Sequence, residues 1–146
     1  MRLCASSGRR TDLAGVPIYV DSSALVKLVL PEAESTALLT LLGDQVEPIS
    51  SALATVEVMR AARRASRDSE VHTRAAVVMA ALHLVRVDDE ILAGAANIEP
   101  ETLRSLDAIH LASALSLAPE VEAMIVYDAD LSEAASRAGL RVLAPA

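Results

Sequence analysis

Apolar and polar residues alternate along the chain in blocks that predict strands and helices in turn. Short apolar runs predict five strands, at residues 17–20, 47–50, 84–87, 123–127 and 140–143. Between them, apolar residues recur at intervals of three and four. This spacing predicts helices over residues 23–30, 32–42, 53–67, 70–83, 88–97, 100–117 and 131–138. Short apolar strands alternating with helices are typical of a three-layer α/β/α sandwich around a mainly parallel sheet.

The pattern predicts one domain over residues 16–146. Residues 1–15 show no helical or strand periodicity, and they lack the apolar core of a signal peptide. We interpret them as a loose N-terminal extension. The domain that follows is long enough to enclose a hydrophobic core of its own.

Two aspartates directly follow predicted strands. Asp21 ends the apolar run in IYVDSSALVKL, and Asp128 ends the one in MIVYDADL. In parallel α/β sheets, binding sites lie beyond the carboxyl ends of the strands, so both side chains are expected at the same edge. Taken alone, each aspartate is better explained as the N-cap of the next helix.

Two further acids interrupt apolar helical stretches. Glu57 lies in SALATVEVMRAARR and Asp107 in LRSLDAIHLASAL. Taken singly, Glu57 is expected to face solvent, and Asp107 is expected to be a first-turn acid favoured by the helix dipole. Taken together with Asp21 and Asp128, they form a set of hard oxygen donors that suits Mg²⁺ or Mn²⁺ rather than zinc.

Composition narrows the class of protein. Hydrophobic residues make up 53% of the chain and charged residues 23%, which is typical of a globular protein. The net charge of −7 argues against non-specific coating of DNA. No apolar run approaches the ~18 residues of a membrane span, so no membrane contact is expected. The single cysteine fits a reducing compartment, and we expect the protein to be cytoplasmic.

From about Ile18 onward, the chain resembles the PIN-domain ribonucleases, and most closely the VapC-type toxins of toxin–antitoxin pairs. The resemblance rests on YVDSSALVKL, SALATVEVMRAARR, LDAIHLASAL and VYDADLSEAASRAGLRVL, in that order. It implies a PIN-like fold, hydrolysis of RNA phosphodiester bonds with Mg²⁺ (Mn²⁺ as a substitute), a homodimer, and inhibition by a VapB-type antitoxin. The acids of the family fall on four residues: Asp21, Glu57, Asp107 and Asp128.

The sequence departs from the family pattern in two places, and one of them is the 15-residue lead-in before Val16, which no family motif covers. Many relatives carry Thr or Ser two residues before the last acid, where this chain has Val126. Asp130 is a candidate to join or to replace Asp128 as a metal-binding or water-bridging acid, although the motif and the strand end favour Asp128. Ser22 and Ser23 are candidate hydrogen-bond donors to the acids, or simply helix caps. His110, one helical turn after Asp107, is either a proton carrier or a packing residue.

Two surfaces are candidates for macromolecular contacts. Arg60, Arg64 and Arg67 fall within ~80° of Glu57 on a helical wheel, which indicates either a row of contacts for RNA phosphates or an ordinary solvated face. The apolar helices over 23–30 and 32–42 predict a groove for an antitoxin helix, with Leu38 or Leu39 on the exposed face.

Three other classes of protein share parts of this pattern. A non-catalytic PIN-like binding module would keep the fold without the chemistry. An Asp-x-Asp phosphohydrolase is suggested by Asp128 and Asp130, but that class needs a later lysine, and none follows. A signalling receiver domain shares the architecture but needs an acidic pair after its first strand and a lysine after a late one.

Overall fold

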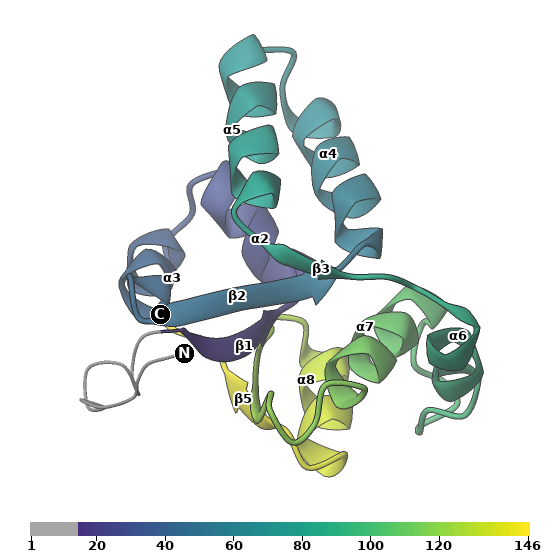
Figure 1. The fold of residues 1–146 in the computed structure, drawn as a ribbon. Helices are drawn as coiled ribbons and strands as arrows, with labels where there is room; N and C mark the ends of the chain where they lie inside the picture. The colour runs from purple at the N-terminus through teal and green to yellow at the C-terminus, as the bar shows by residue number, and fades with distance from the viewer. Residues whose placement is uncertain (1–14) are drawn as a thin grey trace.

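A five-stranded parallel sheet forms the middle layer of the protein (Figure 1). A computed structural model describes residues 15–146, so residues 1–14 of the predicted extension lie outside the described part. The strand order is β3-β2-β1-β4-β5. The strands are β1 (Val16–Val20), β2 (Val46–Ser51), β3 (His83–Val85), β4 (Ala123–Ile125) and β5 (Arg141–Leu143).

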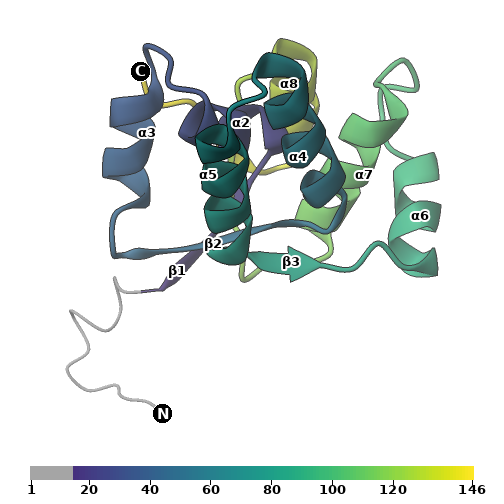
Figure 2. The ribbon, with the colours of Figure 1, turned by 90° about the horizontal axis from the view of Figure 1, so that it is seen from above.

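Four helices cover one face of the sheet: α2 (Ser22–Val29), α3 (Ser35–Leu42), α4 (Leu53–Ala65) and α5 (Ser69–Ala80). Ile18 and Val20 of β1 point into this layer and pack with Leu25, Val29 and Val58. Figure 1 shows α4 and α5 as a helical hairpin that extends away from the sheet, and Figure 2 gives the view from above. One end of α4 therefore lies at the sheet and the other lies far from it.

Three helices occupy the opposite side: α6 (Asp89–Ala96), α7 (Ser105–Leu115) and α8 (Ala129–Arg137). Tyr19 and Met124 point toward this layer and pack with Leu111 and Leu131. Helix α6 lies against α7, outside it (Figure 1). Alternate residues of β1 thus pack into two separate hydrophobic cores, one on each face of the sheet. The predicted three-layer α/β/α sandwich with a parallel sheet is confirmed.

Several predicted boundaries were wrong by a few residues. The helix expected over 100–117 begins only at Ser105, after a turn in which the Leu103 N–H donates to the Pro100 carbonyl at 3.0 Å. The helix expected over 53–67 ends at Ala65, because Ser66 is extended (φ −156°, ψ 149°). The helix expected over 70–83 ends at Ala80, and His83 begins β3.

Helix length bears on one expectation from the sequence. None of the helices within residues 15–146 is long and apolar enough to cross a lipid bilayer.

Candidate active site

The carboxyl ends of β1 and β4 lie side by side and bring two of the predicted acids to one edge of the sheet. The Asp21 N–H donates to the Ile125 carbonyl at 2.9 Å, and the Tyr127 N–H donates to Ser23 Oγ at 3.0 Å. Asp21 follows β1 directly, and Asp128 follows β4 after two residues. Parallel pairing thus places both carboxylates beyond the same sheet edge.

Both aspartates are also N-caps. Asp21 Oδ2 accepts from the Ser23 N–H at 3.1 Å, and Asp128 Oδ1 accepts from the Leu131 N–H at 2.9 Å. Each cap uses one carboxylate oxygen and leaves the other for a different partner. Capping and a role in a site are therefore compatible at these two positions.

Asp107 joins Asp128 through an arginine. The Arg104 guanidinium donates from Nε to Asp107 Oδ2 at 3.1 Å and from a terminal nitrogen to Asp128 Oδ2 at 2.9 Å. Asp107 lies in the first turn of α7, and Arg104 is the residue just before that helix. One cation thus links acids from two helices.

Glu57 belongs to a second cluster, with Ser22 and His110. Ser22 Oγ donates to Glu57 Oε1 at 2.5 Å, and His110 Nε2 lies 2.6 Å from the same oxygen. The Ser22 hydroxyl is also 3.1 Å from His110 Nε2. No hydrogen bond within residues 15–146 uses Glu57 Oε2, so this oxygen is available to a water molecule or a cation.

His110 connects the Glu57 cluster to Asp21. Its Nδ1 is 2.8 Å from the Tyr19 hydroxyl and 3.7 Å from Asp21 Oδ1. The ring is 1% exposed, and α7 carries it over the end of β1. A buried imidazole with carboxylates on two sides is favoured in its charged form, in which both ring nitrogens donate.

The pKa shifts agree with this arrangement. Burial lowers the pKa of His110, but the hydrogen bond to Glu57 and the charge of Asp21 outweigh it, so the net pKa lies above 6.5. Burial raises the pKa of Glu57, but the hydrogen bonds from His110 and Ser22 bring it below its ordinary value. Both shifts favour an ion pair between the two residues.

Asp107 shows the opposite shift. Burial raises its pKa above the ordinary value, although the hydrogen bond from Arg104 opposes the change. Negative charge on Asp128 and Asp21 adds to the increase. Asp107 is thus close enough to both aspartates for their charges to repel, and a cation at this edge would relieve the repulsion.

The donor atoms fit a hard divalent cation, but their present positions do not form a cage. In residues 15–146, no three His, Cys, Asp or Glu side chains converge as ligands for one ion. The four predicted acids nevertheless supply carboxylate oxygens at one sheet edge, as Mg²⁺ and Mn²⁺ prefer. Asp21, Asp107, Asp128 and Glu57 are therefore the residues that would hold such an ion.

The other residues considered in the sequence analysis lie in different surroundings. Val126 is buried among α7 and α8, so it faces the core. Asp130 is exposed and borders a recess with Pro100 and Arg137. Ser23 at the start of α2 accepts from the Tyr127 N–H just after β4, whereas Ser22 contacts Glu57.

Sequence reasoning missed Arg104 and Tyr19 as parts of the site. Arg104 lies three residues before Asp107, a spacing at which side chains on a helix meet, so it was open to recognition. Nothing in the sequence predicted that Arg104 would also contact Asp128, which lies 24 residues after Arg104 in the chain. The contact between Tyr19 and His110 likewise depends on how α7 crosses the sheet edge.

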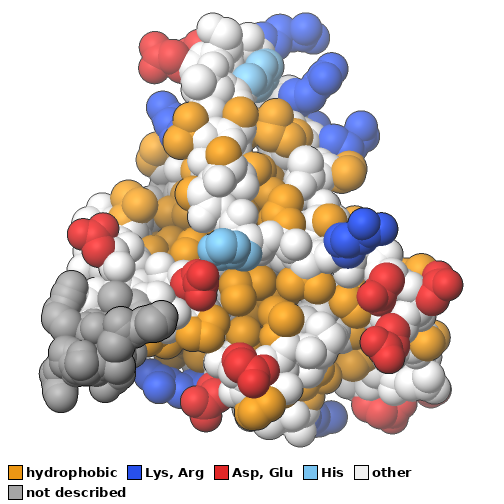
Figure 3. Space-filling model, in the orientation of Figure 1, with side chains coloured by type: hydrophobic (Ala, Val, Ile, Leu, Met, Phe, Trp, Pro, Cys, Tyr) orange, Lys and Arg blue, Asp and Glu red, His pale blue; other side chains and the backbone are white. Residues whose placement is uncertain are grey.

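The arginine row on α4 begins near Glu57 and runs outward. Arg60 and Arg64 are exposed on the helix, and neither forms an ion pair within residues 15–146. The expected place of Arg67 on the same helical face was wrong, because the helix ends at Ala65. Arg67 instead borders a recess at the α4–α5 turn with Arg63 and His72. Figure 3 shows Lys and Arg side chains gathered along this hairpin.

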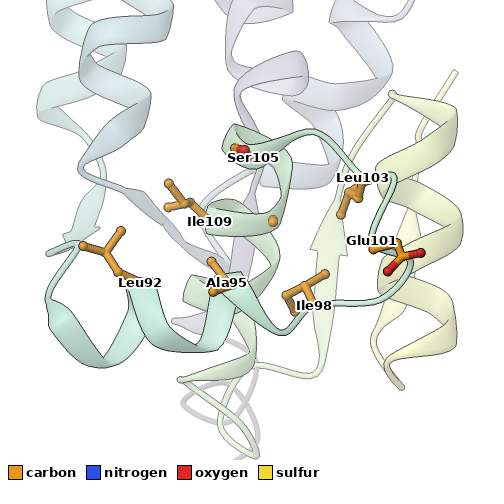
Figure 4. Close-up of a pocket in the computed structure, with 9 residues that line it drawn as sticks. Leu92, Ala95, Ile98, Glu101, Leu103, Ser105 and Ile109 are labelled. Carbon is orange, nitrogen blue, oxygen red and sulfur yellow. The ribbon is translucent and has the colours of Figure 1, made fainter.

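A pocket of about 320 Å³ between α6 and α7 is separate from the carboxylates (Figure 4). Leu92, Ile98, Leu103 and Ile109 line it, and Glu101 is its one acidic residue. None of the four predicted site acids lines this pocket. It belongs to the packing of α6 on α7 and not to the candidate active site.

Comparison with known sequences identifies the family. The PIN domain model matches residues 18–136. Ribonuclease VapC46 of Mycobacterium tuberculosis (strain ATCC 25618 / H37Rv) is 43% identical over 135 residues, which cover 88% of this chain and 97% of that protein. Ribonuclease VapC35 of the same strain is 44% identical over 133 residues, with coverage of 88% and 96%.

Solved structures show the same fold at low sequence identity. VapBC2 from Rickettsia felis, bound to a promoter DNA fragment, aligns with a TM-score of 0.69 at 8% identity, covering 89% of this chain and 99% of that one. Mycobacterium tuberculosis VapC20, a toxin that cleaves the sarcin–ricin loop, aligns with a TM-score of 0.68 at 17% identity and covers 88% and 99%. The matched domain and the two close relatives show that this chain belongs to the PIN-domain family and, within it, to the VapC ribonucleases.

Proposed function

We propose that this protein is an endoribonuclease toxin that hydrolyses RNA phosphodiester bonds with a divalent cation, Mg²⁺ or Mn²⁺. The observation that carries the proposal is that four acids lie at one sheet edge, two of them just after β1 and β4 and two of them on α4 and α7. Burial raises the pKa of Asp107, and the negative charges of Asp128 and Asp21 add to the increase. Carboxylates crowded at a sheet edge cost free energy, so a purely structural role does not explain them. They suit a site where a cation binds a phosphate.

Each residue of the site has a proposed role. Asp21 and Asp128 are the proposed direct ligands, each through the carboxylate oxygen that does not cap a helix. Glu57 and Asp107 hold water or orient the attacking nucleophile. His110 and Ser22 fix Glu57 through Oε1 and thereby aim Oε2 at the site. When bound, a divalent cation supplies charge that offsets the phosphate oxygens and lowers the pKa of a coordinated water.

The arginines on α4 are the proposed contact for the RNA backbone. Arg60 and Arg64 lie on the helix that also carries Glu57, one and two turns further out. They are exposed and have no acidic partner in the described chain, so phosphates can reach them. With no Phe or Trp in the chain, base stacking is not the main grip on RNA.

We further propose a VapB-type antitoxin as partner and a homodimer as the working form. The structures of VapBC2 and of a toxin–antitoxin complex from Klebsiella pneumoniae share the fold of this chain, with TM-scores of 0.69 and 0.65. Leu39 on α3 is 60% exposed and offers an apolar anchor point. Leu38 is fully buried, so of the two predicted anchors only Leu39 is open to a partner.

A nuclease assay on the pure full-length chain tests the function. Cleavage of RNA is expected with Mg²⁺ or Mn²⁺, to stop with EDTA, and to return when the metal is restored in excess. Full activity in EDTA would contradict the proposed metal dependence. Complete inactivity with every metal would favour the alternative of a non-catalytic PIN-like binding module. Light scattering of the same sample tests the homodimer.

A further inference from the structure

The Arg104 guanidinium lies between two of the acids proposed to hold the cation. It contacts Asp107 Oδ2 at 3.1 Å and Asp128 Oδ2 at 2.9 Å. Since Asp128 Oδ1 caps α8 through the Leu131 N–H, both oxygens of Asp128 are engaged when Arg104 is in place. The cation ligand proposed for Asp128 is thus the same oxygen that Arg104 holds.

The arginine is also free to leave. Its side chain is 72% exposed, whereas those of Asp107 and Asp128 are 14% and 29% exposed. The guanidinium therefore buries little surface, and its release breaks two hydrogen bonds without opening the core. Exposed ion pairs of this kind contribute little to stability.

We infer that Arg104 alternates between two partners: the carboxylates of Asp107 and Asp128 when no cation is bound, and an RNA phosphate when one is. This inference rests on the proposed metal-dependent function. The guanidinium neutralises the two acids and keeps them together. A divalent cation at the same oxygens repels it, and the released fork matches the geometry of a phosphate.

The consequence is competition between Arg104 and the metal. Removing the positive charge should make the acids better ligands, because the incoming cation no longer displaces a bound one. A purely structural ion pair predicts the reverse, since removal of the arginine would let Asp107 and Asp128 move apart and weaken the metal site.

Binding of Mn²⁺ to the full-length protein, in the absence of RNA, separates the two cases. Free Mn²⁺ is measured by electron paramagnetic resonance for the unaltered chain, for Arg104→Gln and for Arg104→Lys. Arg60→Gln is the matched control, because it removes one exposed arginine outside the carboxylate cluster. We expect Arg104→Gln to bind Mn²⁺ at least threefold more tightly than Arg60→Gln. The Mn²⁺ affinity of Arg104→Lys should lie between these two, because an ammonium group cannot donate to both carboxylates as the planar guanidinium does.

The second arm uses RNA. At saturating Mn²⁺, Arg104→Gln should raise KM for RNA severalfold, and Arg104→Lys should restore part of the affinity. An Mn²⁺ affinity of Arg104→Gln equal to or weaker than that of Arg60→Gln overturns the inference, even if the nuclease activity is as proposed. Absence of Mn²⁺ binding by the unaltered chain would overturn the proposed metal site as well. Melting curves show whether each variant folds. If Arg104→Gln does not fold, the Mn²⁺ affinity of Arg104→Lys decides: tighter binding than in Arg60→Gln supports the inference, and equal or weaker binding overturns it.

Discussion

His110 Nε2 lies 2.6 Å from Glu57 Oε1, although 53 residues separate the two in the chain. The pair forms because α7 and α4 meet over the end of β1, where Tyr19 and Ser22 complete the hydrogen bonding. Glu57 is thereby held by one oxygen, and the other stays free. We regard His110 as the residue that fixes the orientation of Glu57.

Replacing His110 tests this role. His110→Gln keeps a hydrogen-bonding group but removes the positive charge, so we expect kcat for RNA cleavage to fall about 10–100-fold, the range typical for groups that orient metal-site residues. The free energy of unfolding should fall by about 1–3 kcal/mol, because buried polar partners are left without hydrogen bonds. Activity per folded molecule distinguishes the two effects. An unchanged kcat in a folded variant would reduce His110 to a packing residue.

The same pair makes stability depend on pH. The pKa of His110 is raised above 6.5 in the folded protein, so its contribution is fully present below pH 6.5 and is lost as the pH rises through the folded value. We expect the free energy of unfolding in urea to fall as the pH rises above 6.5, by at most about 1.4 kcal/mol per pH unit from this group. The carboxylates that face the ring are Glu57, Asp21 and Asp107. The ordinary pKa values of carboxylates lie below this window.

The control is His110→Gln measured over the same range. It should show a flatter profile, since the titrating group is gone. Equal slopes for the two proteins would mean that another group, and not the pair with Glu57, sets the pH dependence.

The place of each site residue in the fold determines whether it could be predicted from the sequence. Asp21 and Asp128 were predictable because a strand end fixes a position in a parallel sheet. Glu57 and Asp107 were predictable because each interrupts an apolar helical stretch, where a buried carboxylate is unfavourable unless it has a partner. Arg104 was missed and the partners of His110 were not predicted, since these contacts join residues 24 to 91 positions apart and depend on helix packing. Boundaries failed at Ser66 and at the turn over residues 100–103, where local backbone conformation outweighs apolar spacing.

Asp21→Asn is expected to abolish cleavage while leaving the fold intact. Asparagine caps helices about as well as aspartate, so the Ser23 N–H keeps its acceptor, and one charge is removed from a crowded set of acids. The free energy of unfolding without metal should stay within about 1 kcal/mol of the original or increase.

The matched variant is Asp130→Asn, which removes the same charge from an exposed position outside the cluster. It should retain nearly full activity, which would assign the fourth acid to Asp128. Abolished cleavage in Asp130→Asn, with Asp128→Asn active, would reverse that assignment. If Asp21→Asn keeps full activity per folded molecule, Asp21 is only a helix cap.

The arginine row predicts how RNA binding responds to salt. In the inactive Asp21→Asn background, replacing Arg60 and Arg64 together with Gln should weaken binding of single-stranded RNA. The slope of log affinity against log salt should become shallower by about 0.7 for each phosphate that the protein no longer binds. Fluorescence anisotropy of a labelled oligonucleotide measures both the affinity and the slope.

A second double variant serves as the control for the arginine row. Replacing Arg137 and Arg141 with Gln removes the same charge from α8 and β5, away from α4, and should leave the slope unchanged. Identical slopes in the two double variants would remove α4 from the RNA path.

The exposed leucine of α3 makes a prediction about the antitoxin. Leu39 is 60% exposed, whereas its neighbour Leu38 is fully buried, so Leu39→Glu changes the surface while Leu38→Glu would unfold the core. An amphipathic helix that docks here would bury Leu39 against its own apolar face. We expect Leu39→Glu to weaken binding of the small protein encoded beside this one by at least tenfold, measured by calorimetry on purified partners.

RNA cleavage by free Leu39→Glu should be unchanged, because Leu39 is not part of the carboxylate cluster. Val77→Glu on α5, which places the same charge on another exposed apolar residue, is the control for antitoxin binding. Equally weakened binding in both variants would indicate a general charge effect. Unchanged affinity in a folded Leu39→Glu variant would shift the docking surface to helices after α3.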